Sequence, residues 1–326
     1  MQVLPTLYID RAQALARSGQ IQDAVIALEE GAAASDPESL FTLGLMRLTG
    51  EVLPRDLRRA GEFFQSAAEA GHPDGAHISV AFKTHGAGSA PDWAGGLELL
   101  DRLAATDPDA KRQRNLIAKM ALTERGDPKT LPPAEQLSES PDVRVFRGLF
   151  TPEECKFLID SAIPRLQPAL VGERSTGREY RVSDRTCETA GFALMDEDPA
   201  IHALNRRLAA ASGSTAEQGE PLQVLRYSPG QEYRPHYDLS TGSNPRCQTL
   251  LVYLNDDFEG GETAFVKTGV KFKGRTGDGI LFRNAAPDGT PDLNAEHAGL
   301  PVTRGTKIIA SRWIRAEPID YYKPLT

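Results

Sequence analysis

The spacing of hydrophobic and polar positions changes partway along the chain. In residues 1–123, Ala and Leu are abundant, and the apolar positions follow the three- and four-residue spacing of amphipathic helices. From Gln223 onward, short runs rich in β-branched and aromatic residues alternate with turns that contain Gly and Asp. The pattern therefore predicts an α-helical first part and a β-rich last part.

The helical part contains an internal repeat of 36 residues. Five positions of one unit recur in the next, where Pro37, Gly50, Asp56, Glu62 and Ala68 are matched by Pro73, Gly86, Asp92, Glu98 and Ala104. Ala24 and Ala32 precede Ala60 and Ala68 by the same distance, which indicates a degenerate unit before these two. Each unit is predicted to fold as a helix, a turn that contains Gly, and a second helix.

Residues 43–72, LGLMRLTGEVLPRDLRRAGEFFQSAAEAGH, resemble the Sel-type relatives of the tetratricopeptide repeat. In such repeats small residues allow close approach of the helices, and large apolar side chains such as Phe63 fill the core. The second unit departs from the pattern, because Val80 stands where the first unit has Gly44. An unrelated α-helical bundle is the alternative interpretation.

A polar segment separates the two parts. Residues 124–141 carry four prolines and have the composition of a linker. Shortly after it, Thr151 and Glu154, with a proline between them, form the pattern of a helix capping box. The sequence therefore predicts a two-domain α+β protein, with helical repeats over 1–123, a Pro-rich linker over 124–141, and a β-rich domain with flanking helices over 142–326.

The β-rich domain contains six runs with strand-like composition, at 223–227, 249–254, 263–266, 270–273, 279–282 and 307–315. Many short strands separated by turns with Gly and Asp are typical of an antiparallel sandwich or jelly roll. Gly260 and Gly261 are interpreted as turn residues rather than as a phosphate loop, because no helix follows them.

Composition narrows the functional classes. The net charge is -8, so no overall positive field would attract nucleic acid or an anionic membrane. We see no signal peptide and no apolar run of the roughly 20 residues that a membrane span needs. The three cysteines, Cys155, Cys187 and Cys247, are scattered and form no CxxC pair, which argues against a disulfide scaffold or a thiolate zinc site. These features favour a cytoplasmic protein.

The densest cluster of potential metal ligands is the segment from Tyr233 to Asp238. His236 and Asp238 are two residues apart, so on a strand they face the same side and can approach one ion. Four of the six histidines lie in the repeats or in a predicted helix: His72, His77, His85 and His202. His297 remains as the third ligand. Two histidines and one carboxylate with open positions form the facial triad of non-haem Fe(II) oxygenases.

Two alternatives remain for this cluster on the residues alone. An HxD tripeptide is common, so His236 and Asp238 could be a hydrogen-bonded pair at the end of a strand. Zinc is the competing ion, although hydrolytic zinc sites usually add a further His or Cys ligand.

The last predicted strand, 307–315, carries a lysine on an apolar face. With a period of two, Lys307 shares its side of the strand with Ile309 and Trp313. A lysine in such surroundings is costly unless it meets an anion. The distal carboxylate of 2-oxoglutarate would be that anion, and the alternative is that Lys307 extends to solvent from the strand end.

Residues from about 142 to 316 resemble the catalytic domain of the prolyl 4-hydroxylase family of 2-oxoglutarate/Fe(II) dioxygenases. The resemblance rests on LFTPEEC, EPLQVLRYSPGQEYRPHYD, TLLVYLNDDFEGGETAF, GRTGDGILF, EHAGLPVTRGTK and the closing Trp313, which follow in the family's order. It implies a double-stranded β-helix (jelly roll), Fe(II) held by His236, Asp238 and His297, and Lys307 as the partner of 2-oxoglutarate.

The same resemblance implies further binding residues and cofactors. Tyr227 and Tyr253 match positions that line the co-substrate pocket, although both could be ordinary core tyrosines. Ser311 and Trp313 are additional pocket residues. The implied cofactors are Fe(II), 2-oxoglutarate as co-substrate, and ascorbate.

The implied activity is hydroxylation of a C–H bond, with peptidyl proline as the substrate and succinate and CO2 as co-products. Residues 172–186 stand where relatives carry a loop that faces the substrate, and the repeats are expected to bind a protein or peptide partner. The alternatives are hydroxylation of a free amino acid or other small molecule, and a protein-binding adaptor with an inactive oxygenase domain.

Overall fold

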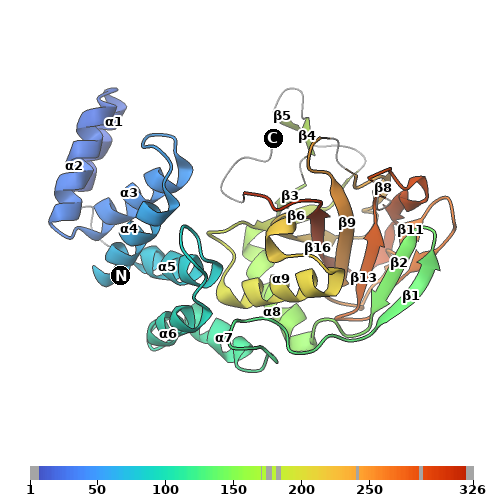
Figure 1. The fold of residues 1–326 in the computed structure, drawn as a ribbon. Helices are drawn as coiled ribbons and strands as arrows, with labels where there is room; N and C mark the ends of the chain where they lie inside the picture. Colours follow the sequence, from blue (N-terminus) through green and yellow to red (C-terminus); the bar gives the residue numbers. More distant parts are fainter. Residues whose placement is uncertain are drawn as a thin grey trace. The chain divides into compact units, whose positions relative to one another are not determined.

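The computed structural model describes residues 7–169, 171–173, 178–180, 185–239, 242–285 and 289–320 (Figure 1). The chain divides into two compact units. The first comprises Met1–Gly126 together with the short segment Glu197–His202, and the second comprises Asp127–Asp196 and Ala203–Thr326. None of the described helices combines the length and the apolarity needed to cross a membrane.

The first unit is built from helices. They are α1 (Leu7–Arg17), α2 (Ile21–Ala33), α3 (Pro37–Thr49), α4 (Leu57–Glu69), α5 (Pro73–His85), α6 (Trp93–Leu103) and α7 (Pro108–Ile117). The pair α5 and α6 begins 36 residues after the pair α3 and α4, so the predicted helix–turn–helix repeat is confirmed.

Equivalent residues begin and end the repeated helices. The carboxylates of Asp56 and Asp92 accept hydrogen bonds from backbone N–H groups of the first turns of α4 and α6, at 3.0 and 2.9 Å. Gly50 and Gly86 end α3 and α5 with φ of 77° and 78°, a left-handed conformation that glycine adopts without steric cost.

The difference between Gly44 and Val80 has a packing explanation. In the first repeat, the ring of Phe64 lies so close to Gly44 that a Cβ at this position would meet Phe64 Cε1 at 2.6 Å. In the second repeat, the residue equivalent to Phe64 is Leu100, which is also completely buried. Because leucine is smaller than phenylalanine, the opposite helix can carry the buried side chain of Val80.

The second unit is an α+β domain. Its helices are α8 (Pro152–Ala162) and the part of α9 (Pro199–Ser212) from Ala203 onward, with short 3-10 turns at Ile163–Arg165, Ala216–Gln218 and Leu293–Ala295. Its strands are β1 (Ala134–Glu139), β2 (Asp142–Phe146), β3 (Gln167–Pro168), β4 (Val171–Glu173), β5 (Arg178–Tyr180), β6 (Glu188–Phe192), β7 (Leu222–Tyr227), β8 (Tyr233–His236), β9 (Arg246–Tyr253), β10 (Glu259–Gly260), β11 (Thr263–Phe265), β12 (Lys271–Phe272), β13 (Gly279–Arg283), β14 (His297–Gly299), β15 (Val302–Arg304) and β16 (Lys307–Arg315).

Two antiparallel sheets form the framework of this domain. The larger has the strand order β1-β2-β13-β9-β16-β7-β6-β3, and the smaller has the order β12-β11-β14-β8. Strands distant in sequence are neighbours in both sheets, which is the arrangement of a jelly roll, so the predicted fold class is confirmed.

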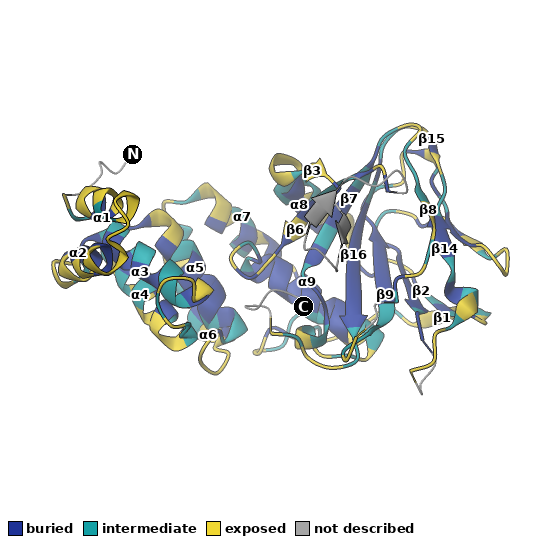
Figure 2. Cartoon of the chain, turned by 90° about the horizontal axis from the view of Figure 1, so that it is seen from above, coloured by how far each residue is buried: buried dark blue, intermediate teal, exposed yellow. Residues whose placement is uncertain are grey.

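The core of the domain follows the two-residue period of its strands. Leu225, Tyr227, Leu251, Tyr253 and Ile309 are all odd-numbered, and all belong to one buried cluster. Buried positions dominate the central strands β9 and β16 of the larger sheet (Figure 2). This cluster surrounds the position from which β16 presents Lys307.

One assignment from composition needs correction. Residues 134–139 belong to the segment predicted as a linker, but they form β1 and pair with β2 as the edge of the larger sheet. The side chains of β1 are mostly exposed. An edge strand with few buried positions has the polar composition of a linker, so composition could not distinguish the two.

Two glycines offer a test of the repeat turns. Gly86 and Gly71 both have positive φ, but a Cβ at Gly86 would meet the backbone N of Pro91 at 2.6 Å, whereas a Cβ at Gly71 would have open space. We expect Gly71→Ala to lower the free energy of unfolding by about 1 kcal/mol through backbone strain alone. Gly86→Ala should cost about 1–3 kcal/mol more because of the steric overlap. Urea unfolding followed by circular dichroism measures both, and equal losses would contradict the packing argument.

Candidate metal centre

Three side chains from two strands of the smaller sheet approach one another. β8 and β14 pair antiparallel with His236 directly opposite His297, and Asp238 follows the end of β8. Asp238 Oδ1 lies 3.5 Å from His236 Nε2, and its Oδ2 lies 3.6 Å from His297 Nε2. The ligand atoms of all three residues lie within 4.8 Å of one another, so the group could hold a metal ion.

The backbone fixes the orientation of both imidazole rings. His236 Nδ1 lies 2.7 Å from the carbonyl oxygen of Arg234, and His297 Nδ1 lies 3.1 Å from that of Ala295. A carbonyl oxygen only accepts, so each Nδ1 carries the hydrogen and donates it. The lone pair of each Nε2 is therefore available on the side of Asp238, which is the tautomer that a metal ligand requires.

A hydrogen-bonded chain holds the carboxylate. Thr249 Oγ1 donates to Asp238 Oδ2 at 2.7 Å, and Asn284 Nδ2 donates to Thr249 Oγ1 at 3.0 Å. Thr249 lies on β9 and is completely buried, so this contact fixes the carboxylate from the larger sheet. Thr249 and Asn284 were not predicted, because a threonine in an apolar strand gives no functional signal in the sequence.

The charge states of the group suit a divalent cation. Burial by itself would raise the pKa of Asp238, but its imidazole neighbours, His297 first, and the hydrogen bond from Thr249 hold this pKa well below its usual value. Burial lowers the pKa of His297 to about 4, against the opposing effect of Asp238. At neutral pH, Asp238 is therefore ionised and His297 is neutral.

A cavity extends from the three residues into the domain. It has about 400 Å³ of space, including its open mouth, and its wall contains His236, Asp238, His297, Lys307, Tyr227, Ser311 and Trp313. The structure therefore brings these predicted site residues together around one cavity.

Lys307 is a buried cation on the wall of this cavity. Its side chain is 2% exposed, and it makes no ion pair with any residue in the described part of the chain. Its Nζ lies 5.4 Å from the ring centre of Tyr227 and 5.3 Å from that of Tyr253. Burial lowers the pKa of Lys307 to about 8, while Glu262 opposes this shift. A buried ammonium without an anionic partner is costly, and a bound carboxylate would stabilise it.

Tyr253 differs from the prediction. It does not line the cavity, and its hydroxyl lies 3.0 Å from both the Phe272 carbonyl oxygen and Thr263 Oγ1. Since the carbonyl only accepts, the Tyr253 hydroxyl donates to it. Burial raises the pKa of Tyr253 to about 12. Its ring therefore packs behind Lys307 as a core residue, which was the alternative interpretation.

Arg185 lines the cavity and was not singled out from the sequence. Its guanidinium carbon lies 5.3 Å from the ring centre of Tyr233 and 5.9 Å from that of Trp313. Arg185 belongs to the predicted substrate-facing loop at 172–186, of which residues 174–177 and 181–184 lie outside the described residues. The resemblance gave only a loop that faces the substrate, and nothing in its sequence indicated that Arg185 would be buried beside two aromatic rings.

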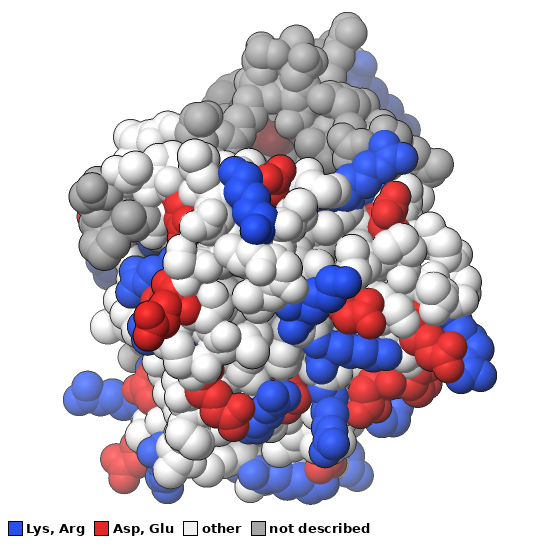
Figure 3. Space-filling view, turned by 90° about the vertical axis from the view of Figure 1, so that its right-hand side faces the viewer, with Lys and Arg blue, Asp and Glu red and all other residues white. Residues whose placement is uncertain are grey.

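The residues present fit Fe(II) and 2-oxoglutarate. Two imidazoles and one carboxylate supply the donor set of a facial triad. Lys307 supplies a buried positive charge that the distal carboxylate of 2-oxoglutarate needs. On the face drawn in Figure 3, acidic and basic side chains are interspersed and no patch of one sign dominates. This face therefore has no feature of a nucleic-acid surface.

Comparisons with known proteins give similarities to both units. The sequence pattern of the 2OG-Fe(II) oxygenase superfamily matches residues 222–315. "Prolyl 4-hydroxylase 1" of Arabidopsis thaliana is 36% identical over 202 residues, which cover 56% of this chain and 71% of that protein.

Two solved structures complete the comparison. The viral collagen prolyl hydroxylase of Paramecium Bursaria Chlorella virus-1, solved as a 2OG complex, is 32% identical, with 54% of this chain and 96% of that chain covered and a TM-score of 0.45. A Sel1 repeat protein of Oxalobacter formigenes is 23% identical, with 33% and 85% covered and a TM-score of 0.31.

The hydrogen bond from Thr249 to Asp238 should control metal affinity. Thr249→Val keeps the shape of the side chain but removes the donor, so we expect Fe(II) affinity to fall by about ten- to a hundredfold. Thr249→Ser retains the hydroxyl and is the matched control. Anaerobic Fe(II) titration of the full chain measures the effect, and equal affinities of the Val variant and the wild type would contradict the role of this contact.

The pKa of Lys307 predicts a pH dependence of co-substrate binding. The charged form binds a carboxylate and exists below about pH 8 in the free protein. We therefore expect 2-oxoglutarate affinity to be constant below that pH and to fall about tenfold per pH unit above it. Calorimetric titration of the anaerobic Fe(II)-loaded protein at a series of pH values measures this dependence.

Two variants serve as controls for this dependence. Lys307→Arg stays charged, so its affinity should not change across the same range. Lys307→Ala should lose about ten- to a hundredfold in affinity below pH 8, since a charge-assisted contact contributes about 1.5–3 kcal/mol. If the alanine variant bound 2-oxoglutarate as well as the wild type, the carboxylate would have to be held elsewhere.

Proposed function

Because this chain belongs to the prolyl 4-hydroxylase family of 2-oxoglutarate- and Fe(II)-dependent oxygenases, we propose that it hydroxylates proline residues in a peptide or protein. The part of the chain that matches the superfamily, residues 222–315, includes all three residues of the candidate metal centre. The chain is thus a 2-oxoglutarate/Fe(II)-dependent dioxygenase, and its substrate is the proposed element.

The observation that supports the proposal most strongly is that one cavity holds both the three ligands and the buried lysine. We assign Fe(II) to His236, Asp238 and His297, and the distal carboxylate of 2-oxoglutarate to Lys307. When bound, iron and 2-oxoglutarate supply the oxidising chemistry, in which O2 is consumed and 2-oxoglutarate is converted to succinate and CO2.

The chain's own residues bind and orient the reactants. The carbonyl groups of Arg234 and Ala295 keep both imidazoles in the ligating tautomer, and Thr249 fixes the carboxylate. With three protein ligands, a bound iron would keep coordination positions for co-substrate and O2. Burial of His297 and Asp238 keeps bulk water from one side of the centre. No residue of the site has to act as a general base.

Residues on the remaining wall have supporting roles in this proposal. Tyr227 pairs with Lys307 across β7 and β16, and its ring is within cation–π distance of the ammonium group. Ser311 and Trp313 follow on the same side of β16. We assign Tyr227 and Ser311 to the co-substrate, and Trp313 to the wall near it.

Partners and conditions belong to the same proposal. The helical repeats are assigned to recognition of the protein substrate, because stacked helix pairs present an extended surface and contain none of the assigned iron ligands. Ascorbate is proposed as an additional cofactor. Cys155, Cys187 and Cys247 form no disulfide, which supports a reducing compartment such as the cytoplasm.

Turnover with proline-containing peptides tests the proposal. The full chain, supplied with Fe(II) and 2-oxoglutarate, should add one oxygen atom to a proline residue and release one succinate per product, as measured by mass spectrometry. His297→Ala should abolish both products, because two ligands do not retain iron. His77→Ala removes a histidine that lies outside the candidate centre, and as the matched control it should convert 2-oxoglutarate without a peptide at the rate of the wild type.

Three outcomes would change the assignment. Hydroxylation of free amino acids but of no peptide would favour a small-molecule hydroxylase. Absence of any 2-oxoglutarate conversion by the iron-loaded protein would favour a protein-binding adaptor. Full activity of His297→Ala would remove this residue from the ligand set.

A further inference from the structure

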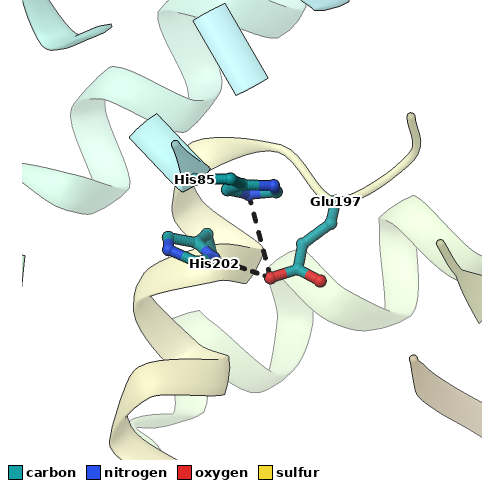
Figure 4. Close-up of side chains that lie close together, drawn as sticks. All are labelled: His85, Glu197 and His202. Carbon is teal, nitrogen blue, oxygen red and sulfur yellow. Dashed lines mark hydrogen bonds and ion pairs between the residues drawn. The ribbon is translucent and has the colours of Figure 1, made fainter. Parts of the chain in front are cut away.

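A second cluster of two histidines and a carboxylate lies in the first unit, away from the candidate metal centre in sequence. It consists of His85, the last residue of α5, Glu197, which lies two residues before α9, and His202 in the first turn of α9 (Figure 4). The segment Glu197–His202 belongs to the same compact unit as α5. Among the described residues, only this cluster and the candidate centre group three potential ligands in this way.

Both imidazoles turn towards the same carboxylate oxygen (Figure 4). Glu197 Oε1 lies 2.8 Å from His202 Nδ1 and 3.8 Å from His85 Nε2. The ligand atoms of the three residues lie within 4.8 Å of one another. Zn2+ holds imidazole nitrogens at about 2.0–2.1 Å, so ligand atoms around a tetrahedral zinc are about 3.4 Å apart. The two observed distances lie on either side of this value.

The cluster is shielded from solvent. The side chains of His85, Glu197 and His202 are 7%, 9% and 10% exposed. The centres of the two imidazole rings are 3.9 Å apart. The ring centre of Trp93 lies 6.3 Å from the imidazole centre of His202. A buried carboxylate with two adjacent imidazoles offers one oxygen and two nitrogen donors to a single ion.

We propose that His85, Glu197 and His202 form a second metal site that binds a divalent transition-metal ion of the zinc type. Two imidazoles and a carboxylate suit zinc better than magnesium or calcium, which prefer oxygen ligands. With three protein ligands, the fourth position of the ion takes water. Asp198 is not a ligand, because its Oδ1 accepts a hydrogen bond from Ile201 N at 2.9 Å and caps α9.

The proposed ion has a structural role. Its ligands come from segments that lie 112 residues apart in the sequence. A bound ion would therefore close a long loop and hold the Glu197–His202 segment against α5 within the first unit. Helix α9 continues from this segment, so the ion would also fix where α9 begins.

Zinc stoichiometry of the full chain tests the proposal independently of catalysis. The candidate iron centre also binds zinc, so the starting protein carries His236→Ala and Asp238→Ala. We expect this variant to bind one equivalent of Zn2+, measured by calorimetry and elemental analysis, and its melting temperature to rise on addition of zinc. Adding His85→Gln should weaken binding at least a hundredfold and abolish the thermal shift.

A neighbouring histidine gives the matched control. His77 lies on the same helix, and its Nε2 pairs with Asp107 at 3.2 Å outside the cluster. His77→Gln in the same starting protein should therefore leave both zinc binding and the thermal shift unchanged. Loss of zinc in His77→Gln, or full retention in His85→Gln, would overturn the assignment.

The zinc-binding test remains conclusive even if one of the variants fails to fold. The starting protein retains all three proposed ligands, so a failure to bind zinc overturns the proposal by itself. If His85→Gln does not fold, Glu197→Gln replaces it as an isosteric variant. X-ray absorption of the zinc-loaded starting protein gives a further readout, because the proposal requires two imidazoles in the zinc shell. A shell of oxygen alone would show an adventitious ion only.

Discussion

The antiparallel pairing of β8 with β14 is the constraint on which the rest of the site depends. It places His236 opposite His297, and the chain just past the end of β8 brings the carboxylate of Asp238 to both imidazoles. A slip of one residue in this register would turn one imidazole to the other face of the sheet and separate the ligands. The carbonyls that orient the rings belong to the same two chain segments, so the register also sets the tautomers. The larger sheet contributes the remaining contacts, through Thr249 on β9 and Lys307 on β16.

The part of the site that follows local periodicity could be predicted from the sequence. The position of Lys307 beside Ile309 and Trp313 is a property of the single strand β16, and the structure has it. His236 and Asp238 also approach one another as predicted, although Asp238 lies just past the end of β8. The role of Tyr253 could not be predicted, because the pairing of its hydroxyl with Phe272 and Thr263 depends on strands 10 to 19 residues away. The hydrogen bond from Thr249 to Asp238 could not be predicted either, because it depends on contact between the two sheets.

The fold shows the same distinction between local and distant information. The repeat of 36 residues predicted the helices of the first unit. This was possible because capping residues such as Asp56 and Gly50 act within one turn of the helix that they begin or end. The edge strand β1 was missed, since its exposed side chains have no alternation to detect. The second histidine cluster was also beyond prediction. His85 and His202 were set aside as helix residues, and only the tertiary structure places Glu197 between them.

The contact of Gly44 with Phe64 has a consequence for how the repeats change over time. The first repeat combines the smallest residue with a large ring, and the second combines the larger Val80 with the smaller Leu100, with both of these side chains buried. Neither member of a pair can be exchanged for its counterpart alone, because one mixed pair overlaps and the other leaves a void. The two helices of a repeat are therefore inherited as one unit, and a recombination breakpoint between them would join incompatible halves even though each half is sound in its own repeat.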